Sequence, residues 1–248
     1  MSDGPTTVGV AGPGEALSDA LADAGLQAVT GTAAEVCGRA PDAVVAVGEA
    51  ALLAVAAEAP DAPLLSVDGP PGAWSVPAAD ATAAVESLAA GEGSTTRHPV
   101  LSVTVDGEPV GTALLDVALM TAEPARISEY GVRAAGEQVA DFRADGVVLS
   151  TPAGSPGYGR AAGAPVLAPE TGVGAVTPVA PFATTDDHWV LPLPTVEFAV
   201  LRDEATVELQ ADGAVVATVE QGATVGVDPA ATVDLLALPA SRSPYRRS

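Results

Sequence analysis

The stretch Asp145–Pro165, DGVVLSTPAGSPGYGRAAGAP, joins two different kinds of sequence. Its first part, up to Ser150, is apolar and β-branched, a composition that favours a strand. The rest contains four glycines and three prolines among Ser, Thr and Tyr. Glycine lets backbone amides approach a ligand closely, and hydroxyls supply donors and acceptors. We therefore predict a ligand-binding loop after a strand; the alternative is a connector in which Gly and Pro only turn the chain.

Upstream of this stretch, as far as residue 92, short apolar runs alternate with Ala- and Leu-rich segments of helical spacing. The apolar runs that predict strands are 6–12, 26–31, 42–48 and 62–69. Strands that are apolar throughout and separated by helices are typical of a parallel sheet covered on both faces. Residues 1–92 are therefore predicted to form an α/β domain.

From Gly93 onward the pattern becomes that of antiparallel hairpins. The pairs Asp106-Gly107 and Asp212-Gly213 each stand between alternating apolar runs, which is the strongest short-range hairpin signal. The stretch 130–150 repeats the arrangement with a looser turn. We predict a second, β-rich domain over residues 93–248, including a C-terminal tail. Because ligands commonly bind at domain junctions, the expected site is the cleft between the two domains.

The charge of the chain restricts its partners. The 32 acidic residues outnumber the 10 basic ones, and the net charge is −22. Such a surface repels nucleic acid and anionic membranes, so neither is an expected partner. The absence of Lys and Asn, with 3% aromatics, indicates a halophilic protein. At molar salt the Debye length is about 3 Å, and self-repulsion within the fold is screened.

The remaining composition points to the cytoplasm and away from a bound metal. Cys37 is the single cysteine, which excludes a disulfide framework and a thiolate metal cluster. His98 and His188 lie far apart in sequence, so a Cys/His zinc site is not expected. The N-terminus lacks a signal-peptide pattern, and no apolar run approaches the roughly 20 residues of a membrane span. A cytoplasmic location is therefore expected.

Taken together, these pieces resemble the NAD kinase family, whose members have the same order of domains. The family reads approximately D-G-x-x-x-S-T-P-x-G-S-T-A-Y where this chain runs from Asp145 to Tyr158. Thr177–Phe182 is similar to the family's T-P-x-x-P segment, and Leu114–Val117 to its L-N-[DE]-V site. The resemblance implies a Rossmann-like α/β domain followed by a β-sandwich domain.

The resemblance also implies an activity and its participants. NAD kinases phosphorylate the 2′-hydroxyl of NAD to give NADP, with ATP or polyphosphate as donor and Mg²⁺ as its companion ion. The small-molecule partner implied for this chain is thus a nucleotide, NAD or NADP. The resemblance further implies a homo-oligomer.

The same resemblance assigns site residues in the β-rich domain. Asp145, Ser155 and Tyr158 are expected to contact the dinucleotide. The family's T-A before the Tyr is Pro156-Gly157 here, so Gly157 enters the expected binding loop and one hydroxyl is lost. Arg160, two residues after Tyr158, is a candidate phosphate contact. The alternative for Arg160 is an ordinary surface arginine.

A further site lies at the family's N-[DE] pair, where this chain has Leu115-Asp116. Asp116 is expected to hold a ribose diol. Leu115 removes the amide that would recognise the adenine end, so those hydrogen bonds are missing.

The largest departure from the family falls on its G-G-D-G-T loop, which here reads VGEAA, Val47–Ala51. Gly48 alone is retained. Glu49 keeps a carboxylate as surrogate base but adds a methylene, and a shift of about 1 Å can cost about 100-fold in rate. Val47 and Ala50 place β-carbons where bare backbone admits phosphates, and Ala51 removes a hydroxyl near the metal-phosphate complex.

Two hypotheses of different classes follow. In the first, the protein is an enzyme that phosphorylates NAD, with Glu49 as base, Asp116 on ribose and the loop 145–158 on the dinucleotide. In the second, it is a catalytically inactive paralogue, a pseudoenzyme that binds a nucleotide or acts as the regulatory partner of an active relative. The retained family pattern favours the first, and the altered VGEAA loop favours the second.

Overall fold

The structure is a computed structural model, and it describes residues 5–123, 126–182 and 188–245. Contacts divide the chain into two compact units. The first unit comprises Met1–His98 and Thr232–Ser248, and the second comprises Pro99–Ala231. The boundary between residues 92 and 93 therefore stays a prediction beside these limits. Each unit is described by itself.

The first unit is built on a parallel sheet. Its strands stand in the order β2-β1-β3-β4 and all run parallel, and β16 adds to β4 through the pair Leu235 and Leu64. The strand bounds are β1 Thr7–Ala11, β2 Gln27–Gly31, β3 Ala43–Val47, β4 Leu64–Val67 and β16 Thr224–Ala237. The central strands β3 and β4 are buried along nearly their whole length, as their continuous apolar sequence predicts.

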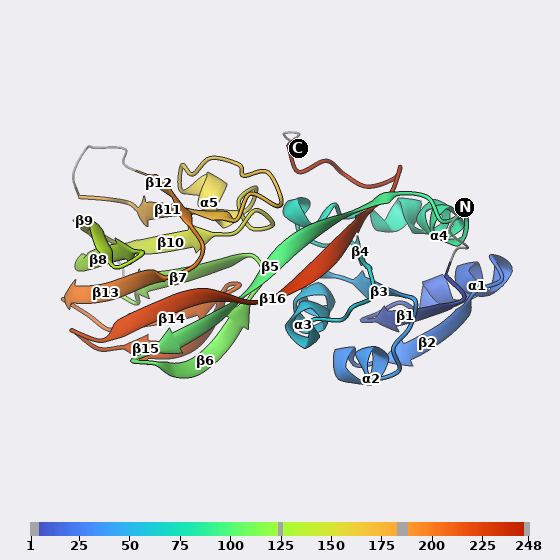
Figure 1. Cartoon of the computed structure of the whole chain (residues 1–248), viewed down its shortest axis with the longest axis horizontal. Coiled ribbons are helices and arrows are strands. Elements are labelled where there is room, and N and C mark those ends of the chain that lie inside the picture. The colour runs from blue at the N-terminus through green and yellow to red at the C-terminus, as the bar shows by residue number, and fades with distance from the viewer. Residues whose placement is uncertain (1–4, 124–125, 183–187, 246–248) are drawn as a thin grey trace. The chain divides into compact units, whose positions relative to one another are not determined.

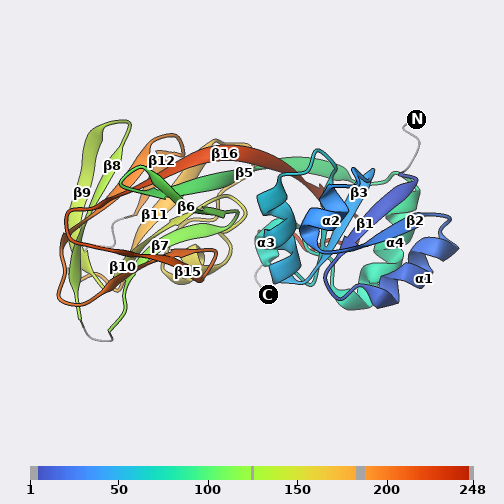
Figure 2. The same cartoon turned by 90° about the horizontal axis from the view of Figure 1, so that it is seen from below.

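Helices cover both faces of this sheet. Their bounds are α1 Glu15–Asp23, α2 Ala33–Cys37, α3 Glu49–Glu58 and α4 Ala81–Ala89, with short 3₁₀ turns at Pro71–Ala73 and Ala78–Asp80. Leu21 of α1 and Val85 of α4 share one core with Val10 of β1. Gly9, which points to the opposite face, lies against Val36 of α2, and α3 packs beside α2. Figures 1 and 2 show α1 beside α4 and α2 beside α3.

The second unit contains two antiparallel layers, both labelled in Figure 1. One layer has the order β6-β5-β16-β13-β8-β9, and the other has the order β12-β11-β10-β7-β14-β15. The bounds in the first layer are β5 Ser94–Val105, β6 Glu108–Ala113, β8 Ser128–Ala134, β9 Glu137–Ala144 and β13 Val196–Arg202. Those in the second are β7 Asp116–Thr121, β10 Gly146–Ser150, β11 Val173–Val179, β12 Trp189–Pro192, β14 Val207–Ala211 and β15 Ala214–Val219.

A single apolar core lies between the two layers. Leu119 of β7 and Leu149 of β10 pack there with Tyr130 of β8 and Phe198 of β13. Because side chains alternate along a strand, the residues next to Leu119 in β7 and next to Leu149 in β10 point to the outer face of this layer, away from the core. The short helix α5, Tyr158–Ala161, contacts β10 and β11. The predicted α/β domain followed by an antiparallel β-sandwich is thereby confirmed.

The hairpin turns follow the sequence with one correction. Asp106-Gly107 and Asp212-Gly213 connect β5 to β6 and β14 to β15, and all four residues have positive φ. The turn between β8 and β9 was expected to be looser, but it also consists of two residues, Ala135 and Gly136, with φ of 49° and 80°. The glycine at the second position makes this tight turn accessible, and Ala135 takes the left-handed conformation that Asp takes elsewhere.

Candidate functional site

The strand order of the first unit defines one edge for ligand binding. The chain passes from β1 outward to β2 and then returns past β1 to β3. The loops that follow β1 and β3 therefore leave the same edge of the sheet and lead to helices on opposite faces. Open α/β sheets bind ligands at such a reversal, outside the carboxyl ends of the strands. In this chain the reversal brings together the loops at residues 12–14 and 47–51.

The VGEAA segment forms a sharp turn from β3 into α3. Gly48 has φ of 87°, and its N–H donates to the carbonyl of Val67 at 2.8 Å. A β-carbon on Gly48 would meet no atom, so positive φ is the reason for glycine at this position. Val47 ends the strand, and Ala50 lies within the helix, so neither adopts positive φ. Glu49 begins α3 and is exposed.

The loop after β1 closes against this turn. Gly12 has φ of 90°, and a β-carbon there would collide with the carbonyl oxygen of Val47 and lie 2.9 Å from the methyl group of Ala51. The two loops thus touch at Gly12, and the Ala51 methyl group lies at their contact. Gly12 was not among the predicted site residues, because a single glycine after a strand carries no specific signal.

In the second unit, the glycine-rich loop is tied to the strand connection before Asp116. Thr151 donates from its N–H to the carbonyl of Leu115 at 2.9 Å and from its hydroxyl to the carbonyl of Leu114 at 2.6 Å. Its hydroxyl also accepts from the N–H of Gly154 at 3.2 Å. A β-carbon on Gly154 would collide with the carbonyl group of Leu115. Glycine at this position therefore permits backbone-to-backbone contact between the two segments.

Ser155 lies inside this loop. Its side chain is fully buried, its hydroxyl donates to the carbonyl of Pro152 at 3.0 Å, and it accepts from the N–H of Leu167 at 2.9 Å. The hydroxyl thus holds the loop in shape, and its predicted contact with a dinucleotide stays a prediction. Gly157 is exposed at the start of α5 and donates its N–H to the carbonyl of Gly154 at 2.8 Å.

Tyr158 interacts electrostatically with two other predicted site residues, Asp116 and Asp145. It begins α5, its side chain is 43% exposed, and its hydroxyl points to the sulfur of Met120 at 3.9 Å. Partial burial raises the pKa of the Tyr158 phenol, and the carboxylates of Asp116 and Asp145 raise it further. Asp116 and Asp145 therefore each lie within electrostatic reach of Tyr158, whose hydroxyl lies beside Met120 of β7. The sequence missed Met120, since a methionine in a strand is ordinarily a packing residue.

Arg160 is the cation within α5. Its side chain is half-buried, and within residues 5–123, 126–182 and 188–245 it forms no ion pair. Its predicted phosphate contact stays a prediction.

The backbone before Asp116 has a second support that the sequence did not reveal. The carboxylate of Asp212 accepts hydrogen bonds from the N–H groups of Leu114, Leu115 and Asp116 at 2.7 to 3.0 Å. Asp212 was predicted only as a turn residue, because an Asp-Gly pair signals a hairpin whatever its carboxylate contacts.

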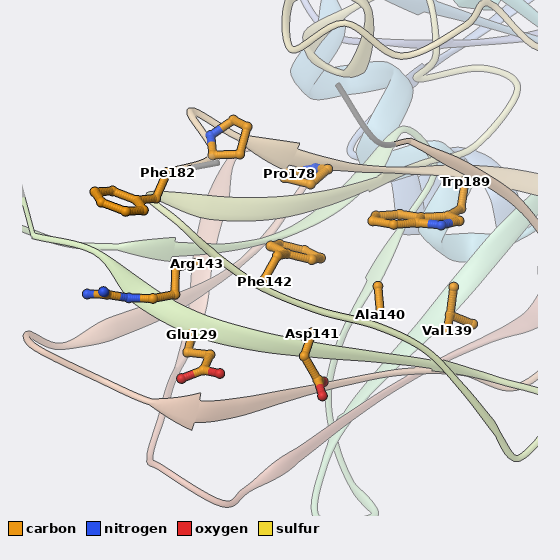
Figure 3. Close-up of a pocket in the computed structure, with 10 residues that line it drawn as sticks. Glu129, Val139, Ala140, Asp141, Phe142, Arg143, Pro178, Phe182 and Trp189 are labelled. Carbon is orange, nitrogen blue, oxygen red and sulfur yellow. The ribbon is translucent and has the colours of Figure 1, made fainter. Parts of the chain in front are cut away.

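A separate pocket of about 680 Å³ lies in the second unit along β9, β11 and β12. Phe142 and Trp189 stack in it with their ring centroids 5.8 Å apart, and Arg143 lies 5.5 Å from the ring centroid of Phe182 (Figure 3). Arg143 also pairs with Glu204 at 3.1 Å. Its positive charge is therefore balanced by a carboxylate.

The residues that the structure describes lack two kinds of feature. They contain no group of three or more His, Cys, Asp or Glu side chains arranged to hold a metal ion. None of the helices seen in them combines the length and the apolar composition required to cross a bilayer.

Comparison with protein families finds a match over part of the chain. Residues 114–232 match the ATP-NAD kinase C-terminal domain. An NAD kinase of Methanosarcina barkeri is 34% identical over 133 residues, which cover 52% of this chain and 48% of that protein. An NAD kinase of Oleidesulfovibrio alaskensis is 42% identical over 81 residues, covering 33% of this chain and 28% of that protein. The matched segments thus span about half or less of these relatives' own length.

Comparison with solved structures covers nearly the whole chain and concerns the fold. An NAD kinase from Archaeoglobus fulgidus in complex with ATP superposes with a TM-score of 0.72 at 21% identity, over 92% of each chain. Yeast NADH kinase complexed with NADH superposes with a TM-score of 0.76 at 15% identity, over 96% of this chain and 85% of the other. The chain thus has the fold of the NAD kinases, and its residues 114–232 are similar in sequence to the ATP-NAD kinase C-terminal domain.

Proposed function

We propose that this protein binds NAD or NADP on the outer side of the β7–β10 layer, at the loop 151–158. The supporting observation is that Tyr158 lies within electrostatic reach of both Asp116 and Asp145, although the three residues come from separate segments. A carboxylate accepts hydrogen bonds from a ribose diol, and a half-exposed tyrosine ring offers a stacking face. Arg160, in the same short helix as Tyr158, supplies a cation for a phosphate group.

The fit of the residues differs between the dinucleotide and a phosphate donor. The loop 151–158 combines an exposed Gly157 with an exposed aromatic ring, as close approach of a planar ligand requires. The turn 47–51 has a single positive-φ glycine, no hydroxyl, and a methyl group at its contact with Gly12. A triphosphate or polyphosphate with Mg²⁺ would therefore meet fewer accessible backbone amides and fewer oxygen ligands at this turn than at the G-G-D-G-T loop of the family.

For the chemistry that follows binding, we carry two candidates. The turn 47–51 favours a non-catalytic nucleotide-binding protein that acts as the regulatory partner of an active NAD kinase. The exposed carboxylate of Glu49, at the reversal point of the sheet, favours 2′-phosphorylation of NAD with ATP or polyphosphate. When bound, the phosphate donor and its Mg²⁺ would supply the transferred group and its charge neutralisation. Glu49 would then take the proton of the attacking hydroxyl.

Binding is tested by calorimetric titration of the full chain with NAD and NADP in molar KCl. We expect Tyr158→Ala and Asp116→Asn each to lower the affinity for the dinucleotide at least about tenfold, or about 1.4 kcal/mol. Asp106→Asn, in a hairpin turn elsewhere in the second unit, is the matched control and should bind as the unmodified chain does. Unmodified protein that binds neither dinucleotide contradicts the proposal.

Catalysis is tested by following NADP formation from NAD, Mg²⁺ and either ATP or polyphosphate. We expect no turnover near the rates of about 1–100 per second that are typical of kinases. Turnover at such rates would establish the enzyme and reject the regulatory candidate. In that case Glu49→Gln should abolish it, and an unchanged rate would remove Glu49 from the mechanism.

The environment and the assembly of the protein belong to the same proposal. We infer a halophilic cytoplasmic protein from the net charge of −22 and the lack of lysine. Its expected assembly is a homo-oligomer or a complex with an active relative. Light scattering in molar KCl measures the mass of the assembly, alone for the homo-oligomer and with the active relative added for the complex.

A further inference from the structure

Asp212 binds the backbone that leads into Asp116. Its Oδ1 accepts from the N–H groups of Leu115 at 2.7 Å and Asp116 at 3.0 Å, and its Oδ2 accepts from Leu114 at 2.8 Å. The N–H of Asp212 donates to the carbonyl of Asp116 at 2.9 Å. Three consecutive N–H groups that converge on one carboxylate form an anion nest. Hydrogen bonds to an ionised acceptor are about twice as strong as neutral ones.

The same short backbone segment is held from its other side. The carbonyls of Leu114 and Leu115 accept from the hydroxyl and the N–H of Thr151. The peptide groups at residues 114 and 115 therefore have their N–H groups fixed by Asp212 and their carbonyls fixed by the glycine-rich loop. Leu115 contributes backbone rather than side chain to this bridge. Replacement of the family's Asn by Leu leaves the bridge intact.

We propose that Asp212 is a positioning residue of the dinucleotide site, which holds Asp116 in register with the loop that carries Tyr158. This inference rests on the proposed binding function. Without the carboxylate of Asp212, three adjacent N–H groups lose their acceptor, and the β6–β7 connection is no longer fixed against β14. Because positioned groups are sensitive to displacements of about 1 Å, loss of this carboxylate should weaken dinucleotide binding.

A second turn in the same unit shows what an Asp-Gly turn does without this role. Asp106 has the same φ of 50° as Asp212, and its N–H donates to the carbonyl of Thr224 at 2.8 Å. Its carboxylate accepts the single N–H of Thr224 at 2.9 Å. Asp106→Asn therefore perturbs a turn of equal geometry that holds no predicted site residue, which makes it the matched control.

The test compares the unmodified chain with Asp212→Ala, Asp212→Asn, Asp116→Ala and Asp106→Asn in molar KCl. Calorimetry measures the affinity for NAD and NADP, and thermal unfolding confirms that each variant is folded. We expect Asp212→Ala to weaken the affinity at least about tenfold. Asp212→Asn keeps one acceptor oxygen, so its affinity should lie between those of Asp212→Ala and the unmodified chain. Asp106→Asn should match the unmodified affinity.

A second readout needs no ligand. Asp116 raises the pKa of Tyr158, so displacement of Asp116 in Asp212→Ala should move the Tyr158 titration toward the ordinary tyrosine range. The titration is isolated as the absorbance difference from the corresponding Tyr158→Phe protein. Asp212→Asn removes the same charge while keeping the shape of the side chain. If the pKa of Tyr158 moves less in Asp212→Asn than in Asp212→Ala, the larger effect of Asp212→Ala comes from displacement of Asp116 and not from loss of the Asp212 charge.

The outcomes distinguish this inference from the function on which it rests. If Asp116→Ala loses binding while folded Asp212→Ala and Asp212→Asn bind as the unmodified chain does, the positioning role is wrong and the binding function stands. If the unmodified chain binds neither NAD nor NADP, the proposed function fails and the inference fails with it. An unmoved Tyr158 titration in Asp212→Ala also refutes the positioning role.

Discussion

Substitution of Gly154 by alanine tests the contact on which the candidate site depends. Gly154 does not have positive φ, so the expected cost comes from space and not from backbone conformation. The new methyl group would collide with the carbonyl group of Leu115 and lie 2.8 Å from its Cα, and backbone atoms cannot move aside as a flexible side chain can. The two segments must therefore separate.

The magnitude follows from two contributions. Overpacking of a filled position costs about 1–3 kcal/mol. Separation also stretches the hydrogen bonds from Thr151 to the carbonyls of Leu114 and Leu115, each worth about 1 kcal/mol. Because stretching forfeits about half of the energy of each bond, we expect the free energy of unfolding of the second unit to fall by about 2–4 kcal/mol.

The assay uses the distribution of tryptophan between the two units. Trp74 lies in the first unit and Trp189 in the second. In a Trp74→Phe background, urea unfolding followed by Trp189 fluorescence reports on the second unit. Gly111→Ala is the control, because its methyl group would meet Val216 at an ordinary 3.4 Å. A Gly154→Ala protein within about 0.5 kcal/mol of its parent would show that the loop does not rest on residues 114–115.

Three further expectations concern titration and salt. Burial lowers the pKa of the His98 imidazole from 6.5 to about 4, so between these pH values the unfolded chain binds more protons than the folded chain. The free energy of unfolding should therefore fall by about 3 kcal/mol as the pH drops through that range. Urea midpoints measured against pH test this, and the same pH slope in His98→Leu would contradict it. Asp116→Asn should lower the pKa of the Tyr158 phenol, measured by absorbance against a Tyr158→Phe reference, and an unchanged pKa would place Asp116 out of reach. The unfolding midpoint should rise from dilute buffer to molar KCl as repulsion within a chain of net charge −22 is screened, and a flat dependence would count against a halophilic protein.

Local patterns predicted the fold because they reflect local physics. The continuous apolar run 42–48 had to become a strand buried on both faces, and the Asp-Gly pairs had to become tight turns. The tight turn at Ala135-Gly136 was missed because no Asp or Asn marks its first position. Turn chemistry is readable from sequence only where the residue type is characteristic.

The site was less accessible to the sequence, because its contacts join distant segments without any periodicity. Family resemblance indicated Asp116, Asp145 and Tyr158, and in the structure both carboxylates lie within electrostatic reach of Tyr158. It could not indicate that the hydroxyl of Ser155 is occupied inside the loop. Nor could it tell Asp212 from Asp106, since identical turn signals differ only in what their carboxylates face.

Strand β16 has a consequence for how the chain is made. The first unit contains Met1–His98 and Thr232–Ser248, so the whole of the second unit is synthesised between its two parts. While a ribosome translates that interval, β4 has β3 on one side and awaits β16 on the other. An unpaired strand edge recruits other strands, so nascent or prematurely terminated chains that lack β16 should be the aggregation-prone species. A cell that makes this protein depends on finishing each copy.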